Sequence, residues 1–309
     1  MVNLQRKCYL DSKSPNPSVE TLLHAFLPHK FVDHTHASAI LGLIDQPNDT
    51  EICKKVFGDK VGIVPYVIPG FDLAKLSYKI FNNNKKVIGL ILLKHGIFTF
   101  GDTAKESYDR MINLVSIAEK ELKRFKNKIL NKKIKIQKIN TNHYDDLFPI
   151  IRKNLSNKDN DGSFTKWIID FRVNENILKY LEHPKLKDFT SRGPVTPDHV
   201  IRTKSKPLIL NLRNIKKDNL DNLVKNEIKK FRKSYKKYYV KNKKYVANTI
   251  ELDPNPRLIF VPGLGIIGIG RSKKEAKIAA DLAEVTVDVI SNAESIGKFT
   301  SIPDREILK

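Results

Sequence analysis

Apolar and polar positions follow two periods along this chain, and the switches between them predict an α/β protein. Apolar residues spaced by three and four positions predict helices, whereas short apolar runs predict buried strands. The helices predicted in the first part of the chain cover residues 18–27, 37–45, 51–58, 71–83 and 103–125. The extended segments predicted there cover residues 30–36, 61–70, 86–96 and 97–103.

The remainder of the chain continues the α/β alternation without an evident internal repeat. Strands are predicted over residues 167–171, 207–212 and 257–262, and helices over residues 144–155, 174–182, 216–244 and 272–291. A basic, polar stretch at 126–143 separates the two parts. We therefore predict one domain over residues 1–130 and a second α/β region over residues 131–309.

Length and composition exclude several classes of protein. The chain has 309 residues, of which 40% are apolar and 8% aromatic, so it is neither mostly disordered nor collagen-like. No apolar run reaches the roughly 20 residues of a membrane-spanning helix, and the N-terminus lacks the apolar segment of a signal peptide. The two cysteines, Cys8 and Cys53, are too few for a disulfide scaffold. We expect a soluble, cytoplasmic protein with no membrane partner.

Positive charge is concentrated after residue 120. The chain has a net charge of +22, yet residues 1–120 hold 15 basic and 12 acidic side chains. The excess gathers in two runs, at 120–138 and at 225–244, and the second is interleaved with aromatic residues. Such a run could contact a nucleic acid, but Lys outnumbers Arg by 44 to 12. This bias favours a lysine-rich background on solvated helices, and a nucleic-acid-binding protein remains an alternative.

Three histidines suggest a metal site. His34 and His36 lie two positions apart in a predicted strand, so both imidazoles point to the same face. His95 ends an apolar strand where the chain turns at Gly96. Three histidines with one open position form a typical catalytic zinc site. From the residues alone, a pair of histidines hydrogen-bonded within a sheet is an equally good interpretation.

A carboxylate precedes the histidine strand. Glu20 lies near the start of the helix predicted over residues 18–27. Beside a metal-bound carbonyl compound it would be placed to act as a general base. An acidic residue at a helix N-terminus also stabilises the helix dipole, and taken alone Glu20 favours that structural role.

Several motifs together resemble one family. They are SxETLLHAFLPxKFVDHTH (18–36), VPYVxPGFDLAK (64–75), LLKHGxFTFGDT (92–103), GPVTPDHVIRTK (193–204) and NPRLIFVPGLG (255–265). The combination resembles the class II aldolase/adducin family, and within it the bifunctional rhamnulose-1-phosphate aldolase/lactaldehyde dehydrogenase proteins. The resemblance covers most of the chain. It implies an α/β/α class II aldolase-like sandwich followed by a second α/β region.

The resemblance also implies an activity and a site. In such aldolases one zinc ion per subunit is held by the histidines that match His34, His36 and His95, and Glu20 matches the acid/base. Ser18 matches a residue of the substrate-phosphate pocket. The implied reaction cleaves a ketose 1-phosphate, such as rhamnulose 1-phosphate, to dihydroxyacetone phosphate and an aldehyde. A sugar-phosphate 4-epimerase uses the same ligands and remains an alternative, and the family further implies a homo-oligomer.

Two departures from the family pattern put catalytic activity in doubt. The family's phosphate-binding segment, rich in glycine and asparagine, lies before the glutamate and is not found here. The related bifunctional proteins also continue into a dehydrogenase domain beyond the region that matches this chain. We therefore expect a sandwich that is truncated at its N-terminus, with poor stability unless a complementing chain supplies the missing part. A non-catalytic fragment is the corresponding alternative.

A glycine motif near the end of the chain resembles a dinucleotide-binding loop. Gly263, Gly265 and Gly268 form GxGxxG between an apolar strand and a helical pattern. Pro262 and the apolar residues between the glycines favour a tight strand-to-helix turn instead. We accordingly expect no NAD, and we treat these glycines as weak candidates for an anion site.

The segment TPDHVIRTK (196–204) gathers polar and charged residues, among them Asp198, His199, Arg202 and Lys204. Two interpretations remain open. The segment either binds a phosphate or lines a second site, or it is a polar loop that leads into the next strand. The resemblance includes these residues but implies no role for them.

Overall fold

The computed structural model describes residues 2–131, 136, 139, 146–157, 163–246 and 249–308. The chain forms two compact units, Met1–Ile44 with Asn48–Glu121, and Asp45–Pro47 with Leu122–Lys309. Each unit combines helices with a four-stranded mixed sheet. The predicted α/β fold class is therefore confirmed.

The first unit is built around the sheet β1-β4-β3-β2. Its strands are β1 (Phe31–Thr35), β2 (Val61–Val64), β3 (Gly89–Leu92) and β4 (Gly96–Gly101). Its helices are α1 (Val2–Lys7), α2 (Thr21–Phe26), α3 (Ser38–Ile44), α4 (Asp49–Phe57), α5 (Phe71–Asn83) and α6 (Ala104–Lys123). β2 pairs with β3 in parallel, and the other pairs are antiparallel.

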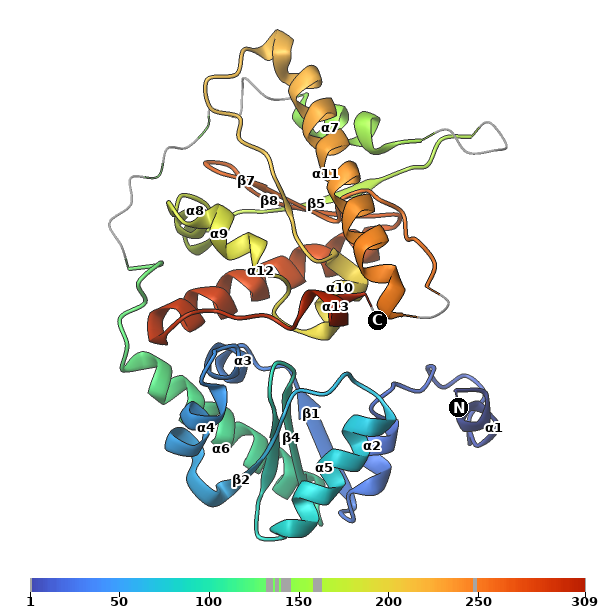
Figure 1. Cartoon of the computed structure of the whole chain (residues 1–309), viewed down its shortest axis with the longest axis vertical. Helices are drawn as coiled ribbons and strands as arrows, with labels where there is room; N and C mark the ends of the chain where they lie inside the picture. The colour runs from blue at the N-terminus through green and yellow to red at the C-terminus, as the bar shows by residue number, and fades with distance from the viewer. Residues whose placement is uncertain are drawn as a thin grey trace. The chain divides into compact units, whose positions relative to one another are not determined.

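Helices cover both faces of this sheet. Successive residues along β4 point to opposite faces, and each face contacts a different set of helices. Phe98 and Phe100 face α2 and α5, which pack side by side and contribute Leu23, Leu73 and Phe81 to the same core. On the other face, the hydroxyl of Thr99 donates a hydrogen bond to a backbone carbonyl of α6 at 2.9 Å. Figure 1 shows the sheet between α5 and α6.

The second unit is built around the sheet β5-β8-β7-β6. Its strands are β5 (Ile168–Arg172), β6 (Leu208–Ile209), β7 (Leu258–Val261) and β8 (Gly265–Gly270). Its helices are α7 (Leu147–Leu155), α8 (Glu175–Leu181), α9 (Leu186–Ser191), α10 (Pro197–Thr203), α11 (Leu220–Asn242), α12 (Lys273–Ile296) and α13 (Asp304–Ile307). α7 and α11 pack on the face that carries Ile267 and Ile269. α12 packs closely on the other face, against Gly268.

The two sheets have the same topology, so the absence of an internal repeat that we inferred from the sequence is wrong at the level of structure. In each unit the first strand pairs antiparallel with the fourth, the fourth antiparallel with the third, and the third parallel with the second. A helix pair covers one face, α2 with α5 and α7 with α11. The repeat lies in the order and pairing of the strands. Different side chains support the same backbone arrangement in the two units, so the repeat is not evident in the sequence.

The predicted strand-to-helix turn at the GxGxxG motif is also wrong. The glycines lie in a β-hairpin, in which Val261 of β7 pairs with Gly265 of β8. Gly268 lies within β8, where an added Cβ would come within 2.4 Å of the backbone oxygen of Ala276 in α12. The glycine spacing thus permits close packing of a helix on a strand. The strand was missed because three glycines in six residues are typical of a loop.

The segment TPDHVIRTK forms helix α10, so of the two interpretations left open the polar loop is wrong. The side chain of Thr196 accepts a hydrogen bond from the backbone N–H of His199, and Pro197 occupies the first turn. Both features are signals for a helix N-terminus. The α10 helix ends at Lys204, which has a φ of 67°.

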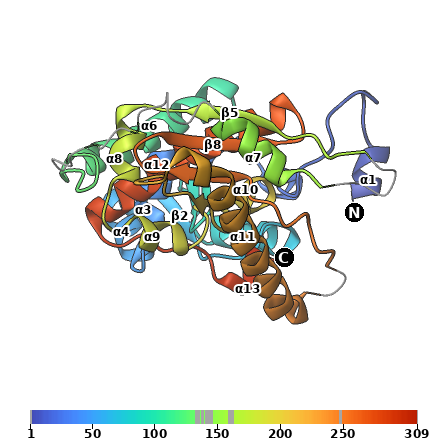
Figure 2. The ribbon, with the colours of Figure 1, turned by 90° about the horizontal axis from the view of Figure 1, so that it is seen from above.

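The structure describes the whole of the second basic run but only part of the first. Part of the 120–138 run lies outside the described residues. The 225–244 run lies mostly on α11, which buries Val224 and Ile228 while its lysines are exposed. Figure 2 shows α11 as one uninterrupted helix. None of the helices in the described ranges is long and apolar enough to cross a lipid bilayer.

Candidate metal centre

Four predicted site residues meet at one end of the first sheet. His34 lies near the end of β1 and His36 directly follows that strand. His95 lies in the turn between β3 and β4, which pairs Leu92 with Gly96. Glu20 is the residue before α2, and its backbone N–H donates to the hydroxyl of Ser18 at 3.1 Å.

The side chains of these residues converge. One atom from each of Glu20, His34, His36 and His95 lies within 4.8 Å of the other three. Oε1 of Glu20 is 3.1 Å from Nε2 of His34 and 2.8 Å from Nε2 of His95. Nε2 of His34 is 2.9 Å from Nε2 of His36. Three imidazole nitrogens and one carboxylate oxygen therefore face a common centre.

His34 is held with one nitrogen toward this centre. Its Nδ1 lies 2.9 Å from the carbonyl oxygen of Ile97, which can only accept, so Nδ1 carries the proton. In the neutral ring this leaves the lone pair on Nε2, the atom that faces the other donors. The ring also stacks on Phe98 with a centroid distance of 4.0 Å. Strand pairing and stacking together fix both the tautomer and the orientation.

His95 is buried, with a relative exposure of 1%. Within the described part of the chain, neither of its ring nitrogens makes a hydrogen bond, although Nε2 is close to Glu20. The preceding residue, Lys94, has a φ of 60°, and its ammonium lies 3.4 Å from the carboxylate of Asp49. This ion pair connects the hairpin turn to α4. The turn thereby presents a buried imidazole whose Nε2 faces Glu20, as expected for a metal ligand.

Glu20 is ionised at neutral pH. Burial raises the pKa of Glu20, but its contacts with His34 and His95 lower it further, so the pKa stays well below its usual range. The ionised carboxylate and the three imidazoles place four possible ligand atoms within 4.8 Å of one another, an arrangement that a cation would satisfy. The donor set therefore fits a divalent metal ion. Imidazole ligands favour zinc and similar transition metals over magnesium or calcium.

Ser18 lies close to this centre in sequence, but its observed contact is structural. The side chain is exposed, and its oxygen accepts the hydrogen bond from the backbone of Glu20. It helps to fix the start of α2. Contact with a substrate phosphate remains a prediction.

The other candidate residues belong to the second unit. Gly263, Gly265 and Gly268 lie in the β7–β8 hairpin. His199 is buried, with Nδ1 2.7 Å from the hydroxyl of Thr196, and Arg202 is exposed. The side chain of Asp198 lies outside the described part of the structure. These residues are not part of the histidine cluster.

Sequence reasoning missed the residues that support the ligands, namely Ile97, Phe98, Asp49 and Lys94. The contacts of Ile97 and Phe98 depend on the register of β1 against β4, which pairs His34 with Phe98. An HxH strand does not reveal its partner strand. The one local signal is Lys94, a non-glycine residue in a tight turn beside a histidine.

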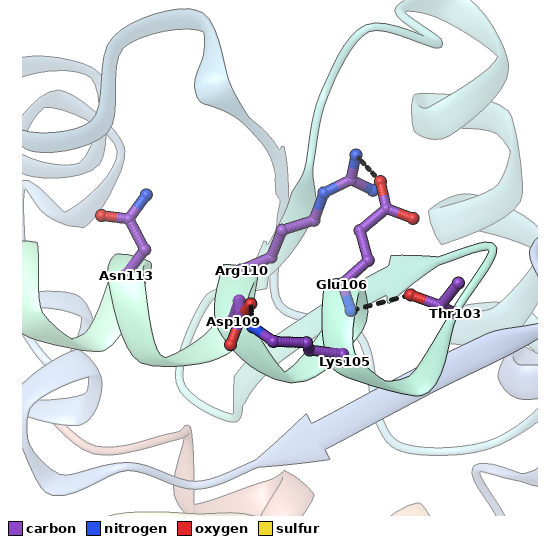
Figure 3. Close-up of a pocket in the computed structure, with 6 residues that line it drawn as sticks. All are labelled: Thr103, Lys105, Glu106, Asp109, Arg110 and Asn113. Carbon is purple, nitrogen blue, oxygen red and sulfur yellow. Dashed lines mark hydrogen bonds and ion pairs between the residues drawn. The ribbon is translucent and has the colours of Figure 1, made fainter.

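An open depression on the first unit lies along α6, and Figure 3 shows the six residues that line it. Its charged groups are paired with one another, Glu106 with Arg110 and Lys105 with Asp109. Thr103 accepts the backbone N–H of Glu106 as a helix cap. Because its charged side chains form ion pairs with one another, the depression is a weaker candidate site than the histidine cluster.

Comparison with known proteins places the chain in a family. Residues 1–122 match the model for the class II aldolase and adducin N-terminal domain, and residues 142–309 match that for the second domain of class II aldolase. The second match alone spans more than half of the chain. The chain belongs to the class II aldolase family, and its His/Glu cluster supports a metal-dependent, aldolase-like role.

Two individual proteins are similar to the chain. One is an uncharacterised oxidoreductase of Bacillus subtilis strain 168, YuxG, which is 29% identical over 320 residues. This match covers 99% of the chain and 44% of the relative, so the chain spans less than half of that protein. The other is the solved N-terminal class II aldolase domain of a conserved protein from Thermoplasma acidophilum. It is 47% identical, covering 39% of this chain and 55% of that one, with a TM-score of 0.35.

Proposed function

We propose that this chain is a zinc-dependent aldolase that cleaves a ketose 1-phosphate, such as rhamnulose 1-phosphate, to dihydroxyacetone phosphate and an aldehyde. The observation that carries the proposal is the convergence of Glu20, His34, His36 and His95 within 4.8 Å. Membership of the class II aldolase family supports the reaction class and a sugar phosphate as substrate. It also supports assembly into a homo-oligomer.

The roles of the four residues follow from their positions. His34, His36 and His95 would hold the metal through nitrogens on one side of the sheet. A bound divalent metal supplies Lewis-acid stabilisation of the negative charge that develops on the substrate carbonyl oxygen. Glu20 is ionised and lies within 3.1 Å of two of the imidazoles, so its carboxylate would accept and return a proton beside the reacting carbon. The proton would come from the C4 hydroxyl, whose oxygen forms the aldehyde carbonyl as the C3–C4 bond breaks. The electron pair left on C3 of the dihydroxyacetone fragment then takes up that proton.

The test combines metal analysis with a retro-aldol assay on the purified chain. Rhamnulose 1-phosphate is supplied, and dihydroxyacetone phosphate is measured before metal removal, after chelation and after zinc is restored. We expect one zinc per chain and cleavage that is lost and regained with the metal. Glu20→Gln serves as the matched variant, because it should retain zinc and lose cleavage.

Other outcomes separate the proposal from its alternatives. Inversion at C4 without cleavage would identify a 4-epimerase on the same ligands. Zinc binding without any turnover, on a panel of ketose 1-phosphates, would identify a non-catalytic metal-binding chain. Failure to bind zinc would contradict the assignment of the site itself.

A further inference from the structure

The second unit contains a small cavity that the proposed aldolase reaction does not use. It lies between the end of α10 and the middle of α11 and has a volume of about 70 Å³. Its polar lining residues are Lys204, Ser205, Lys206, Ser234, Tyr235 and Tyr238. This volume accommodates a few water molecules or one small oxyanion.

Lys204 forms the wall of this cavity in an unfavourable backbone conformation. Its φ of 67° and ψ of 177° fall in a region that is essentially restricted to glycine. The residue is also buried, with a relative exposure of 8%. Backbone strain at a buried lysine persists only where the surrounding structure imposes it, and such residues cluster at binding sites.

The ammonium group of Lys204 has no carboxylate partner among the described residues. Nζ donates to the backbone carbonyl of Asp253 and lies 3.8 Å from the ring centroid of Tyr235. The carboxylate of Asp253 is engaged elsewhere, with Arg257 at 3.2 Å and Arg271 at 3.8 Å. Burial lowers the pKa of Lys204 to about 8; the charge of Arg257 adds to this effect, and the carboxylates of Asp253 and Glu251 partly oppose it. A buried cation with no carboxylate at ion-pair distance among the described residues is unfavourable, so this geometry favours an anion beside Nζ.

We propose that this cavity binds one phosphate-sized oxyanion, with Lys204 as its principal charged ligand. The hydroxyls of Ser205 and Ser234 would supply neutral donors from opposite walls. Lys206 is exposed and adds a second positive charge beside the cavity. The lysines on α11 raise the local concentration of anions by long-range attraction. The site is independent of the histidine cluster.

Equilibrium dialysis of the full chain against radiolabelled inorganic phosphate tests this proposal. The wild type should bind one phosphate saturably at millimolar or lower concentration. Lys204→Met should weaken binding at least about tenfold, the cost expected for a charged hydrogen bond, and Ser234→Ala should weaken it less. His95→Leu and Lys233→Met are the controls, because they remove one histidine of the cluster and an exposed α11 lysine outside the cavity. Both should bind phosphate as the wild type does.

Either of two results would overturn the proposal. Absence of saturable phosphate binding to the wild type, or wild-type affinity in Lys204→Met, would contradict it. If Lys204→Met loses its circular dichroism spectrum, the affinity of the folded Ser234→Ala decides, and an unchanged value overturns the proposal. A parallel competition with glycerol 3-phosphate identifies the source of the anion. Tighter binding of the ester indicates the phosphate group of a larger ligand, and weaker binding indicates free phosphate.

Discussion

The two units of this chain share a strand order but differ in the chemistry at one end of the sheet. His34 pairs with Phe98 in the first sheet, and Phe171 pairs with Ile267 at the corresponding place in the second. His95 directly precedes Gly96, and Leu264 directly precedes Gly265. His36 and Val173 correspond in the same way, each directly after its strand. The three histidines of the first unit therefore correspond to apolar residues in the second.

The backbone around these positions is nevertheless alike. A Cβ on Gly96 would meet the backbone oxygen of Thr35 at 2.6 Å, and one on Gly265 would meet that of Arg172 at 2.5 Å. The residues at the turns, Lys94 and Gly263, both have positive φ. The comparison teaches that this sheet and its hairpin provide a scaffold, while a few side chains decide whether it holds a metal.

The largest effect is expected when the first unit is given the residues of the second. In a His34→Phe/His95→Leu double variant, zinc affinity should fall at least about 100-fold, beyond the loss seen when only an outer-shell partner is removed. Calorimetric titration with zinc measures the affinity. The variant should keep its circular dichroism spectrum, because the same side chains are accommodated in the second sheet. Zinc bound at wild-type affinity would contradict the assignment.

Glu20 should matter to chemistry more than to metal binding. Glu20→Gln preserves the size of the side chain and removes its ability to accept a proton. The kcat for cleavage should fall by about 10²- to 10⁴-fold, the range for loss of a general base. Steady-state kinetics and metal analysis of the same preparation check this. A variant with wild-type kcat would remove Glu20 from the mechanism.

The sheets also differ in how closely a helix approaches them. Gly268 of β8 corresponds to Thr99 of β4. A Cβ on Gly268 would lie 2.4 Å from the backbone oxygen of Ala276, whereas at Thr99 there is room for a side chain that hydrogen-bonds to the backbone of α6. Gly268→Ala should destabilise the protein by about 2–3 kcal/mol through overpacking. Thr99→Ala, the control in the other unit, loses one neutral hydrogen bond and should cost about 1 kcal/mol. Urea denaturation compares the two, and equal costs would refute the difference.

Acid should destabilise the second unit through His199. Burial lowers the pKa of His199 to about 4, so the unfolded chain binds this proton more readily than the folded chain. The stability contribution is therefore intact above about pH 6.5 and is lost as the pH falls toward 4, by up to about 3 kcal/mol. Chemical denaturation across this range should show a weaker pH dependence in His199→Gln than in the wild type. Parallel profiles would contradict this account.

The smallest effect is expected at the turn beside His95. Lys94→Gly introduces the residue of the second unit, which relieves positive-φ strain and removes the ion pair with Asp49. These contributions are each about 1 kcal/mol and oppose one another, so stability should change by no more than about 1 kcal/mol. Thermal denaturation measures it. A loss above about 2 kcal/mol would show that the ion pair dominates.

The sequence predicted some of these features and not others, for physical reasons. Helix α5 was predicted over 71–83, its observed bounds, because its apolar residues recur with helical period. Strand β8 was missed because its glycines are typical of a loop. Their role becomes clear only from the close packing of α12 on the strand. The common face of His34 and His36 follows from strand geometry alone. Their approach to Glu20 and His95 depends on strand register and on a hairpin, which local patterns do not specify.

The central claim is that the first unit alone holds a metal at His34, His36 and His95. Crystals of the zinc-loaded protein, measured above and below the zinc absorption edge, test it most directly. The account predicts one anomalous peak within bonding distance of Nε2 of all three histidines, and none at Phe171 and Leu264. A map without a peak at the histidines, or with zinc bound elsewhere instead, would contradict it.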